Sequence, residues 1–196
     1  EAGIANIGQM RNLLAMLSST STLGTFSGVV KYVAEFKENH SELSKLFSTA
    51  TVFLFVGSLL SSAVLFFGAN FLSLYVFNSN EFFYVFQLLA IIVPFIAFGR
   101  LINGIISGLS DYKKYAKIEL ISYLLVTATL VFGLYVYDLK GVLIAIALAP
   151  VIQLIVLGFI FGKTLKKYVR FNTIKYNLSY KNQLLAFTLM SFVSAF

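Results

Sequence analysis

The chain lacks cysteine and tryptophan, has only two prolines and one histidine, and carries few charges. Without cysteine it offers no disulfide, no thiol nucleophile and no thiolate ligand for a metal. His40 has no neighbouring ligand pattern, so most metal sites built on imidazole are excluded as well. Charged residues make up 12% of the chain, about half the share usual in soluble domains. We therefore expect no metal and no cofactor, and a soluble enzyme is disfavoured.

A formal net charge of +7 would suit a nucleic-acid-binding protein, but the positions of the charges disfavour this function. They are separated by uncharged, largely apolar runs of 18 to 35 residues, over 12–30, 46–80, 82–99, 120–137 and 141–162. Runs of this length match the roughly 20 residues that an α-helix needs to cross a bilayer. The sequence therefore predicts an all-α, polytopic transmembrane helical bundle and no nucleic-acid partner.

The apolar runs divide the chain into segments. We expect five transmembrane helices within residues 1–162, over about 10–30, 47–67, 83–107, 118–137 and 141–162. A basic linker follows over 163–183, and 184–196 begins a further transmembrane helix. The chain starts at Glu1 and stops inside an apolar run, so we expect a fragment cut at both ends.

Basic residues are concentrated in every second connector, and this alternation indicates the topology. The connectors 31–45, 111–119 and 163–181 hold 12 of the 15 Lys and Arg residues, whereas the alternate connectors hold only Lys140. Such a bias predicts that the basic connectors are cytoplasmic and that the first span begins outside. Residues 163–181 are either a basic amphipathic helix on the inner membrane surface or a solvated loop.

Arg11 and Arg100 are the two basic residues that lie outside the connectors. A cation within a hydrocarbon layer is costly, so it usually faces a partner or a watery cavity. Arg100 shares a helical face with Asn103. In a continuous first helix, Arg11 would lie within about 40° of one line with the hydroxyls of Ser18, Thr22 and Thr25. The alternative is that Arg100 snorkels to the interface and Arg11 lies among the headgroups.

No Asp or Glu lies deep in an expected span, and Glu119 falls at a cytoplasmic helix start, where we expect it to be solvated. A cavity lined by cations and hydroxyls suits an anionic substrate, because phosphate groups gain charge-assisted hydrogen bonds there. Gly104 and Gly108 form a GxxxG pair, for which we expect a role in close helix packing. Pro94 and Pro150 fall inside spans and predict kinks.

The first span and its cytoplasmic end resemble the O-antigen translocases, the Wzx-type polysaccharide flippases of the multidrug/oligosaccharidyl-lipid/polysaccharide exporter superfamily. The most specific element of the resemblance consists of Gly28, Lys31, Tyr32, Ala34 and Glu35. Further residues that fit are Gly3, Gly8, Gln9, Asn12, Leu23, Gly24 and Thr25. Elsewhere the similarity is one of span order and loop charge over essentially the whole chain.

The resemblance implies one lobe of a two-lobed bundle that lacks its first helix, with residues 163–183 as the linker between lobes. It also implies a multi-pass transporter of the bacterial inner membrane, not an enzyme. The implied function is flipping an undecaprenyl-pyrophosphate-linked oligosaccharide, an O-antigen or related repeat unit, by alternating access. Implied partners are this substrate, membrane lipids and other polysaccharide assembly proteins; ion coupling is compatible with the resemblance.

We expect the substrate cavity to be lined by Arg11, Ser18, Thr22, Thr25, Arg100 and Asn103, with Lys31 at its cytoplasmic mouth. One rival is a cation-coupled multidrug antiporter of the same superfamily, which would place a carboxylate in this cavity. A second rival is a membrane enzyme of polysaccharide assembly, which would need long polar external loops. The external connectors here, 68–81 and 138–140, are short.

Overall fold

The computed structural model describes residues 2–168 and 178–193, and every secondary-structure element in these ranges is a helix. In chain order they are α1 (Ala2–Thr20), α2 (Phe26–Phe36), α3 (His40–Phe67), α4 (Ala69–Phe77), the 3-10 helix η1 (Asn80–Phe82), α5 (Phe83–Gly108), α6 (Tyr112–Tyr168) and α7 (Lys181–Val193). Among the described residues, three stretches are long and apolar enough to cross a membrane: His40–Phe67, Asn80–Gly108 and Tyr112–Leu165. The expectation of an all-α bundle with several membrane spans is confirmed.

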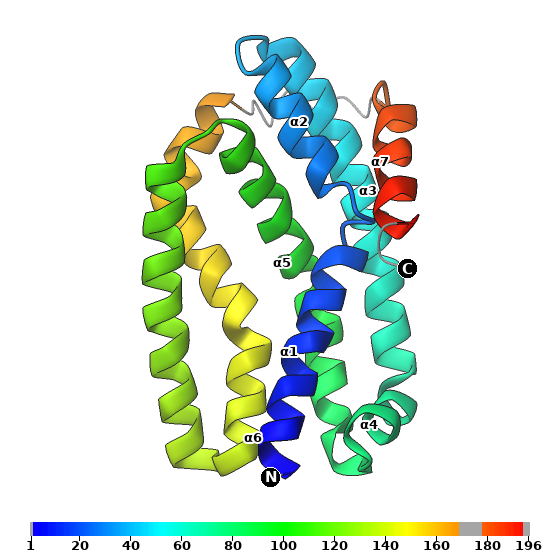
Figure 1. Ribbon diagram of the computed structural model, residues 1–196, viewed down its shortest axis with the longest axis vertical. Coiled ribbons are helices and arrows are strands. Elements are labelled where there is room, and N and C mark those ends of the chain that lie inside the picture. The colour runs from blue at the N-terminus through cyan, green and yellow to red at the C-terminus, as the bar shows by residue number, and fades with distance from the viewer. Residues whose placement is uncertain (1, 169–177, 194–196) are drawn as a thin grey trace.

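α6 consists of two antiparallel limbs, which lie side by side on the left of Figure 1. The backbone leaves helical geometry at Tyr137 and Asp138, and Asp138 adopts a left-handed φ of 50°. The two backbones touch beside this turn, since a Cβ atom on Gly133 would lie 2.6 Å from the carbonyl oxygen of Gly141. The hairpin therefore carries the fourth and fifth expected spans, and its turn depends on two glycines.

The first expected span, 10–30, is not one continuous helix. α1 ends at Thr20, a turn occupies residues 21–25, and α2 begins at Phe26. Leu23 and Gly24 have φ values of 49° and 67°, which a helix does not accommodate. In Figure 1 the break lies about halfway along the height of the molecule, with α1 below it and α2 above it. The assumption of a single helical face for the first span is therefore wrong.

Hydroxyl side chains explain why the helix stops here. Ser and Thr can donate to carbonyls three or four residues earlier and so compete with the helical ladder. Thr20 Oγ1 donates to the Met16 carbonyl at 3.0 Å, Thr22 Oγ1 to Ser19 at 3.1 Å and Thr25 Oγ1 to Thr22 at 2.8 Å.

The turn packs against α3, where a Cβ atom on Gly57 would lie 2.6 Å from the Ser21 carbonyl oxygen. Non-helical backbone at membrane depth is tolerated where protein buries it, and Ser21, Thr22 and Thr25 are all buried.

α5 contains Pro94, which has no N–H to donate to the carbonyl of Ala90 one turn earlier. The structure supplies a substitute donor from the neighbouring helix, because Ser62 Oγ of α3 donates to the Ala90 carbonyl at 2.6 Å. A proline that would otherwise leave a bare carbonyl in hydrocarbon thus becomes a link between α3 and α5.

The substitution Ser62→Ala is expected to lower stability by about 1 kcal/mol, because it leaves the Ala90 carbonyl without its donor. The thermal midpoint of the purified protein in detergent measures this loss. Ser61→Ala, the same change one residue earlier, is the matched control and should have a smaller effect. Equal midpoints for the two variants would contradict the role of this bond.

Small residues bring α2 against α5, as the GxxxG pair predicts. A Cβ atom on Gly104 would lie 3.2 Å from Val29 Cγ1, and one on Gly108 would lie 2.6 Å from Val33 Cβ. The expected packing role of Gly104 and Gly108 is confirmed.

α7 packs on the other side of α2, where Gly28 faces Leu184 and Phe187. The contact is held at its outer end by Tyr180, whose hydroxyl donates to Glu42 Oε2 of α3 at 2.6 Å. Burial, together with this hydrogen bond, raises the pKa of the Tyr180 hydroxyl above its ordinary value.

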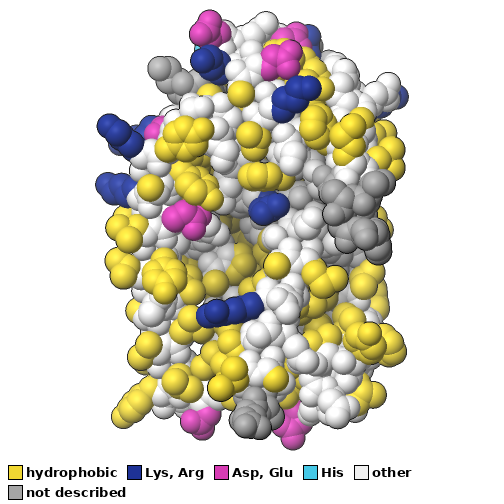
Figure 2. Space-filling view, in the orientation of Figure 1, with side chains coloured by type: hydrophobic (Ala, Val, Ile, Leu, Met, Phe, Trp, Pro, Cys, Tyr) yellow, Lys and Arg dark blue, Asp and Glu magenta, His cyan; other side chains and the backbone are white. Residues whose placement is uncertain are grey.

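The connectors between α2 and α3 and between α5 and α6 lie at one end of the bundle, and α7 also begins there (Figure 1). These are the connectors in which the basic residues are concentrated. Figure 2 shows most charged side chains toward the ends of the molecule, whereas the middle of this face is largely apolar and carries a few basic and acidic side chains. Of the expected linker, 163–168 continues α6, and residues 169–177 lie outside the described part of the chain.

Two apolar cores are stacked along the bundle. One, at the end with the basic connectors, includes Val33, Leu46, Ile106 and Phe161, and the other includes Met10, Phe86 and Leu143. α5 contributes to both cores: Ile96 belongs to the core with Met10, and the next residue, Ala97, belongs to the core with Val33. The break between α1 and α2 falls at the same junction, since Leu17 belongs to one core and Val29 to the other.

Candidate functional site

A polar cavity of about 280 Å³ lies at the junction of the two cores. It is bounded by α1, α5 and both limbs of α6, and its lining residues are Leu14, Ser18, Phe95, Ile96, Gly99, Arg100, Asn103, Tyr115, Glu119, Pro150 and Gln153. The lining carries one cation and one carboxylate. Its polarity contrasts with the apolar cores on either side, so the cavity is the candidate site.

Arg100 is the cation of the cavity. It lies eight residues before the end of α5, which corresponds to about 12 Å of helix from the end with the basic connectors. Its Cζ atom is 4.6 Å from the centre of the Phe26 ring, in the arrangement of a cation–π contact. Arg100 Nε is buried and has no hydrogen-bond partner. The side chain is thus directed into the bundle rather than out to the headgroups.

Asn103 and Ser18, two more of the residues expected at the substrate cavity, line the same cavity as Arg100. Asn103 lies one turn after Arg100 on α5, and its Oδ1 atom is buried without a partner. Ser18 comes from α1, with its hydroxyl donating to the Ala15 carbonyl at 2.8 Å. Unpaired buried polar atoms are costly, so Arg100 Nε and Asn103 Oδ1 together mark a place for a polar ligand.

The other four predicted residues do not line this cavity. Thr22 and Thr25 lie in the buried turn after α1, where their hydroxyls hydrogen-bond to backbone carbonyls. Lys31 is exposed on α2, with its Nζ 5.3 Å from the centre of the Tyr32 ring and 5.7 Å from that of Phe187. It therefore faces α7, not the cavity.

Arg11 is exposed on α1. It precedes Leu14 by three residues and Ser18 by seven, so all three share one face of the helix. Arg11 thus lies about 10 Å along this face from Ser18, toward the end of the bundle that holds the chain's N-terminus (Figure 1).

Glu119 and Gln153 were assigned no role from the sequence, and the expectation of a cavity without a carboxylate is wrong. α6 begins at Tyr112, so Glu119 lies two turns inside the helix and faces the cavity. Gln153 Nε2 of the second limb donates to Glu119 Oε1 at 2.7 Å. A signal was present in the sequence, because Gln153 is the only amide or charged residue in the run 141–162.

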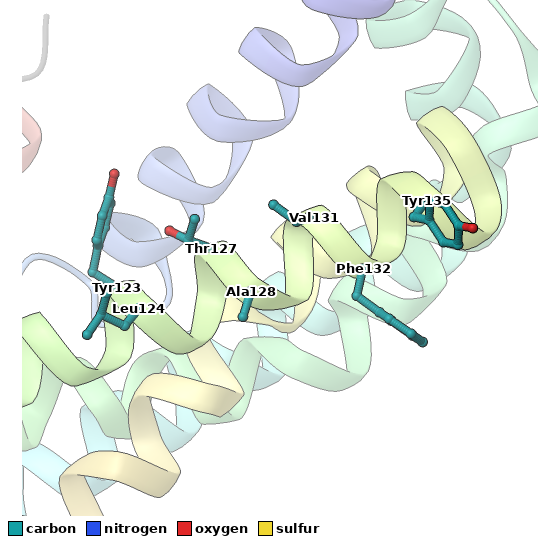
Figure 3. A pocket seen from close by; sticks show the side chains of 7 residues that line it. All are labelled: Tyr123, Leu124, Thr127, Ala128, Val131, Phe132 and Tyr135. Carbon is teal, nitrogen blue, oxygen red and sulfur yellow. The ribbon is translucent and has the colours of Figure 1, made fainter.

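A second hollow of about 640 Å³ lies on the first limb of α6 (Figure 3). Its lining residues are Tyr123, Leu124, Thr127, Ala128, Val131, Phe132 and Tyr135, all from one helix. They include no charged side chain, so this surface cannot compensate the charge of an anionic ligand. Exposed apolar side chains of this kind suit contact with lipid hydrocarbon.

A bundle of membrane-spanning helices, interrupted at mid-height beside a cavity that holds the Arg100 guanidinium, defines the protein as an integral membrane protein with an internal polar site. Its broken first span resembles the discontinuous helices on which membrane transporters build their binding sites.

Comparison with known proteins places the chain more closely. A family model described as "Polysaccharide biosynthesis protein" matches residues 8–195, and the chain belongs to this family. The Lipid III flippase of Escherichia coli (strain K12) is 25% identical over 154 residues, which cover 79% of this chain and 37% of that protein. The Lipid III flippase of Shigella flexneri gives the same values. The chain thus spans less than half the length of these relatives, and no solved structure matches it. The resemblance carried by Gly28 to Glu35 is confirmed at the level of the family.

Proposed function

We propose that this protein is a membrane transporter, not an enzyme, and that it flips a lipid-linked oligosaccharide across the bacterial inner membrane. Family membership and the similarity to Lipid III flippases support this proposal. The observation that carries it is the position of Arg100 in a polar cavity between two apolar cores. A flippase must carry a charged head through the depth at which charge is least tolerated.

Arg100 would bind the pyrophosphate that joins the lipid to the sugars. An unpaired ion in hydrocarbon costs several kcal/mol or more, and charge-assisted hydrogen bonds from a guanidinium offset this cost. The Phe26 ring contacts the guanidinium, with its centre 4.6 Å from Arg100 Cζ, and a guanidinium in a cation–π contact can still donate N–H hydrogen bonds to an anion. Arg11, farther along the same face of α1 as Ser18, would receive the phosphate charge on its way out, while the isoprenoid tail stays in lipid.

The break between α1 and α2 supports an alternating-access mechanism. Residues 21–25 lie at the depth of the cavity, between the two cores. Two half-helices that meet in a turn can change their mutual angle without unwinding, so the halves of the bundle could open one end of the cavity at a time.

The end that carries the basic connectors would face the cytoplasm, where the lipid-linked oligosaccharide is loaded. Partners would be this substrate, membrane lipids and other proteins of polysaccharide assembly. We propose no cofactor and leave the driving ion unassigned.

One observation favours the rival of a cation-coupled multidrug antiporter, namely the carboxylate of Glu119 in the cavity. Against it stands Arg100, whose guanidinium in the same cavity would repel the cationic drugs that such antiporters commonly carry. A growth assay separates the two functions. Deletion of the gene should leave resistance to cationic drugs unchanged if the protein is a flippase.

The direct test uses the same deletion strain. Lipid-linked oligosaccharide is expected to accumulate on the inner face of its membrane, and surface polysaccharide is expected to fall, because the unit is made but not moved. Extraction of the lipid fraction and blotting of surface polysaccharide measure both, and the wild-type gene should restore them. A deletion strain with normal surface polysaccharide and no accumulated intermediate would refute the function.

A further inference from the structure

The cavity has two walls of opposite hydrogen-bonding character. The guanidinium of Arg100 on α5 can donate hydrogen bonds but cannot accept them. It lies against the Phe26 ring of α2. Glu119 lies on α6, and an ionised carboxylate accepts hydrogen bonds but donates none. Among the described residues, no ion pair joins Arg100 to Glu119. The two charges therefore line one cavity without neutralising each other in direct contact.

Glu119 is held in place by the second limb of α6. Gln153 Nε2 donates to Glu119 Oε1 at 2.7 Å across the hairpin. This bond orients the carboxylate, and its other oxygen, Oε2, takes no part in it. Tyr115 lies one turn before Glu119 on the same face and adds an aromatic ring to the wall.

A diphosphate and a sugar differ in what they can offer to these walls. A diphosphate diester is anionic and carries only acceptor atoms, so it pairs with Arg100 and is repelled by Glu119. A sugar hydroxyl donates a hydrogen bond, which a carboxylate accepts strongly. The apolar face of a sugar ring also suits contact with an aromatic ring. The charges of the cavity thus orient a head that contains both groups.

We propose that Glu119, Gln153 and Tyr115 form a sugar-binding subsite opposite Arg100, which takes the sugar directly attached to the diphosphate. This inference rests on the proposed function, since it assigns the second half of the same head. A volume of about 280 Å³ lies at the small end of ligand cavities, and it suits one sugar with the adjoining phosphate better than a longer part of the head. Discrimination among substrates then begins at the first sugar, through hydroxyls that Glu119 accepts.

The test compares two soluble probes of equal charge. One is a short-chain isoprenyl diphospho-N-acetylglucosamine, and the other is the methyl diester of the same isoprenyl diphosphate, which lacks the sugar. Both bind through the diphosphate, so the ratio of their dissociation constants isolates the sugar contribution. The full-length protein in lipid nanodiscs is expected to bind the sugar probe about tenfold tighter or better.

In Glu119→Ala this preference should fall to within about twofold, while affinity for the methyl probe stays equal or rises, because a repelling charge is removed. Arg100→Gln should instead weaken both probes by the same factor. Glu81→Ala, which removes an exposed carboxylate at the far end of the bundle, is the matched control and should keep the wild-type ratio. Glu119→Gln, which preserves the shape, provides a second variant and should lower the ratio severalfold.

Two failures can be told apart. If both probes bind with the expected dependence on Arg100, but neither Glu119 variant changes their ratio, the sugar subsite is refuted and the proposed function stands. Equal weakening of both probes by Glu119→Gln also refutes the subsite, because it indicates a structural role. If the wild-type protein binds neither probe, the proposed function fails, and the subsite fails with it.

Discussion

Arg100→Gln is expected to reduce transport by roughly 100-fold, because it removes the only cation among the side chains that line the cavity and leaves Phe26 facing a neutral amide. The anionic head would then cross the junction of the two cores without a partner. Complementation of the deletion strain, scored by surface polysaccharide and by accumulated lipid-linked oligosaccharide, measures the loss.

Graded substitutions sharpen this prediction. Arg100→Lys keeps the charge but loses the planar fork and its stacking on Phe26, so partial activity is expected. Arg11→Ala should have a smaller effect, because Arg11 is exposed. Lys140→Gln removes an exposed cation at the far end of the bundle and should be close to wild type. Full complementation by both Arg100→Gln and Arg11→Ala would show that neither cation serves the substrate.

Gly141→Val is expected to prevent assembly of the α6 hairpin or to destabilise the protein by about 3 kcal/mol or more. Its new Cβ atom would be driven into the carbonyl group of Gly133, and backbone cannot move aside as the end of a side chain can. The hairpin carries Glu119 on one limb and Gln153 on the other, so the cavity depends on this turn. Yield of folded protein and the thermal midpoint in detergent measure the effect.

Gly158→Ala is the matched control for the hairpin. Gly158 lies on the second limb of α6, and apart from its chain neighbours and the nearby backbone of its own helix no atom lies within 4 Å of its added Cβ position. In a helix interior alanine is favoured over glycine by up to about 1 kcal/mol, so this variant should be neutral or slightly stabilised. If Gly141→Val proved as stable as Gly158→Ala, the close contact at the turn would be contradicted.

Hydropathy predicts where the apolar stretches lie, and the distribution of charge predicts that the basic connectors lie at one end of the bundle. Both signals arise from contact with lipid and can be assessed residue by residue. They locate helix ends less well. The apolar run of the fourth span begins near Ile118, but α6 begins at Tyr112, since a helix can continue past the hydrocarbon layer. This difference of six residues is why Glu119 falls at a solvated helix start in the sequence and inside the cavity in the structure.

The break in the first span was less accessible to sequence reasoning. The spacing of its hydroxyl residues predicts one face of a continuous helix, whereas in the structure Thr22 and Thr25 donate to backbone carbonyls where the helix ends. Whether such hydroxyls line a helix or stop it depends on neighbours far along the chain. Here the neighbour is Gly57 of α3, which leaves room for the displaced Ser21 carbonyl. No pattern local to 10–30 contains that information.

This broken span also bears on how the chain enters the membrane during synthesis. The turn at residues 21–25 has its non-helical backbone covered by α3, and α2 packs on Gly104 and Gly108 of α5. Both helices leave the ribosome later than the turn that they cover. A bare turn in hydrocarbon is unfavourable, so the first span cannot settle in its final form as it emerges. It must wait beside the insertion machinery, or enter as a continuous helix that breaks once α3 and α5 arrive.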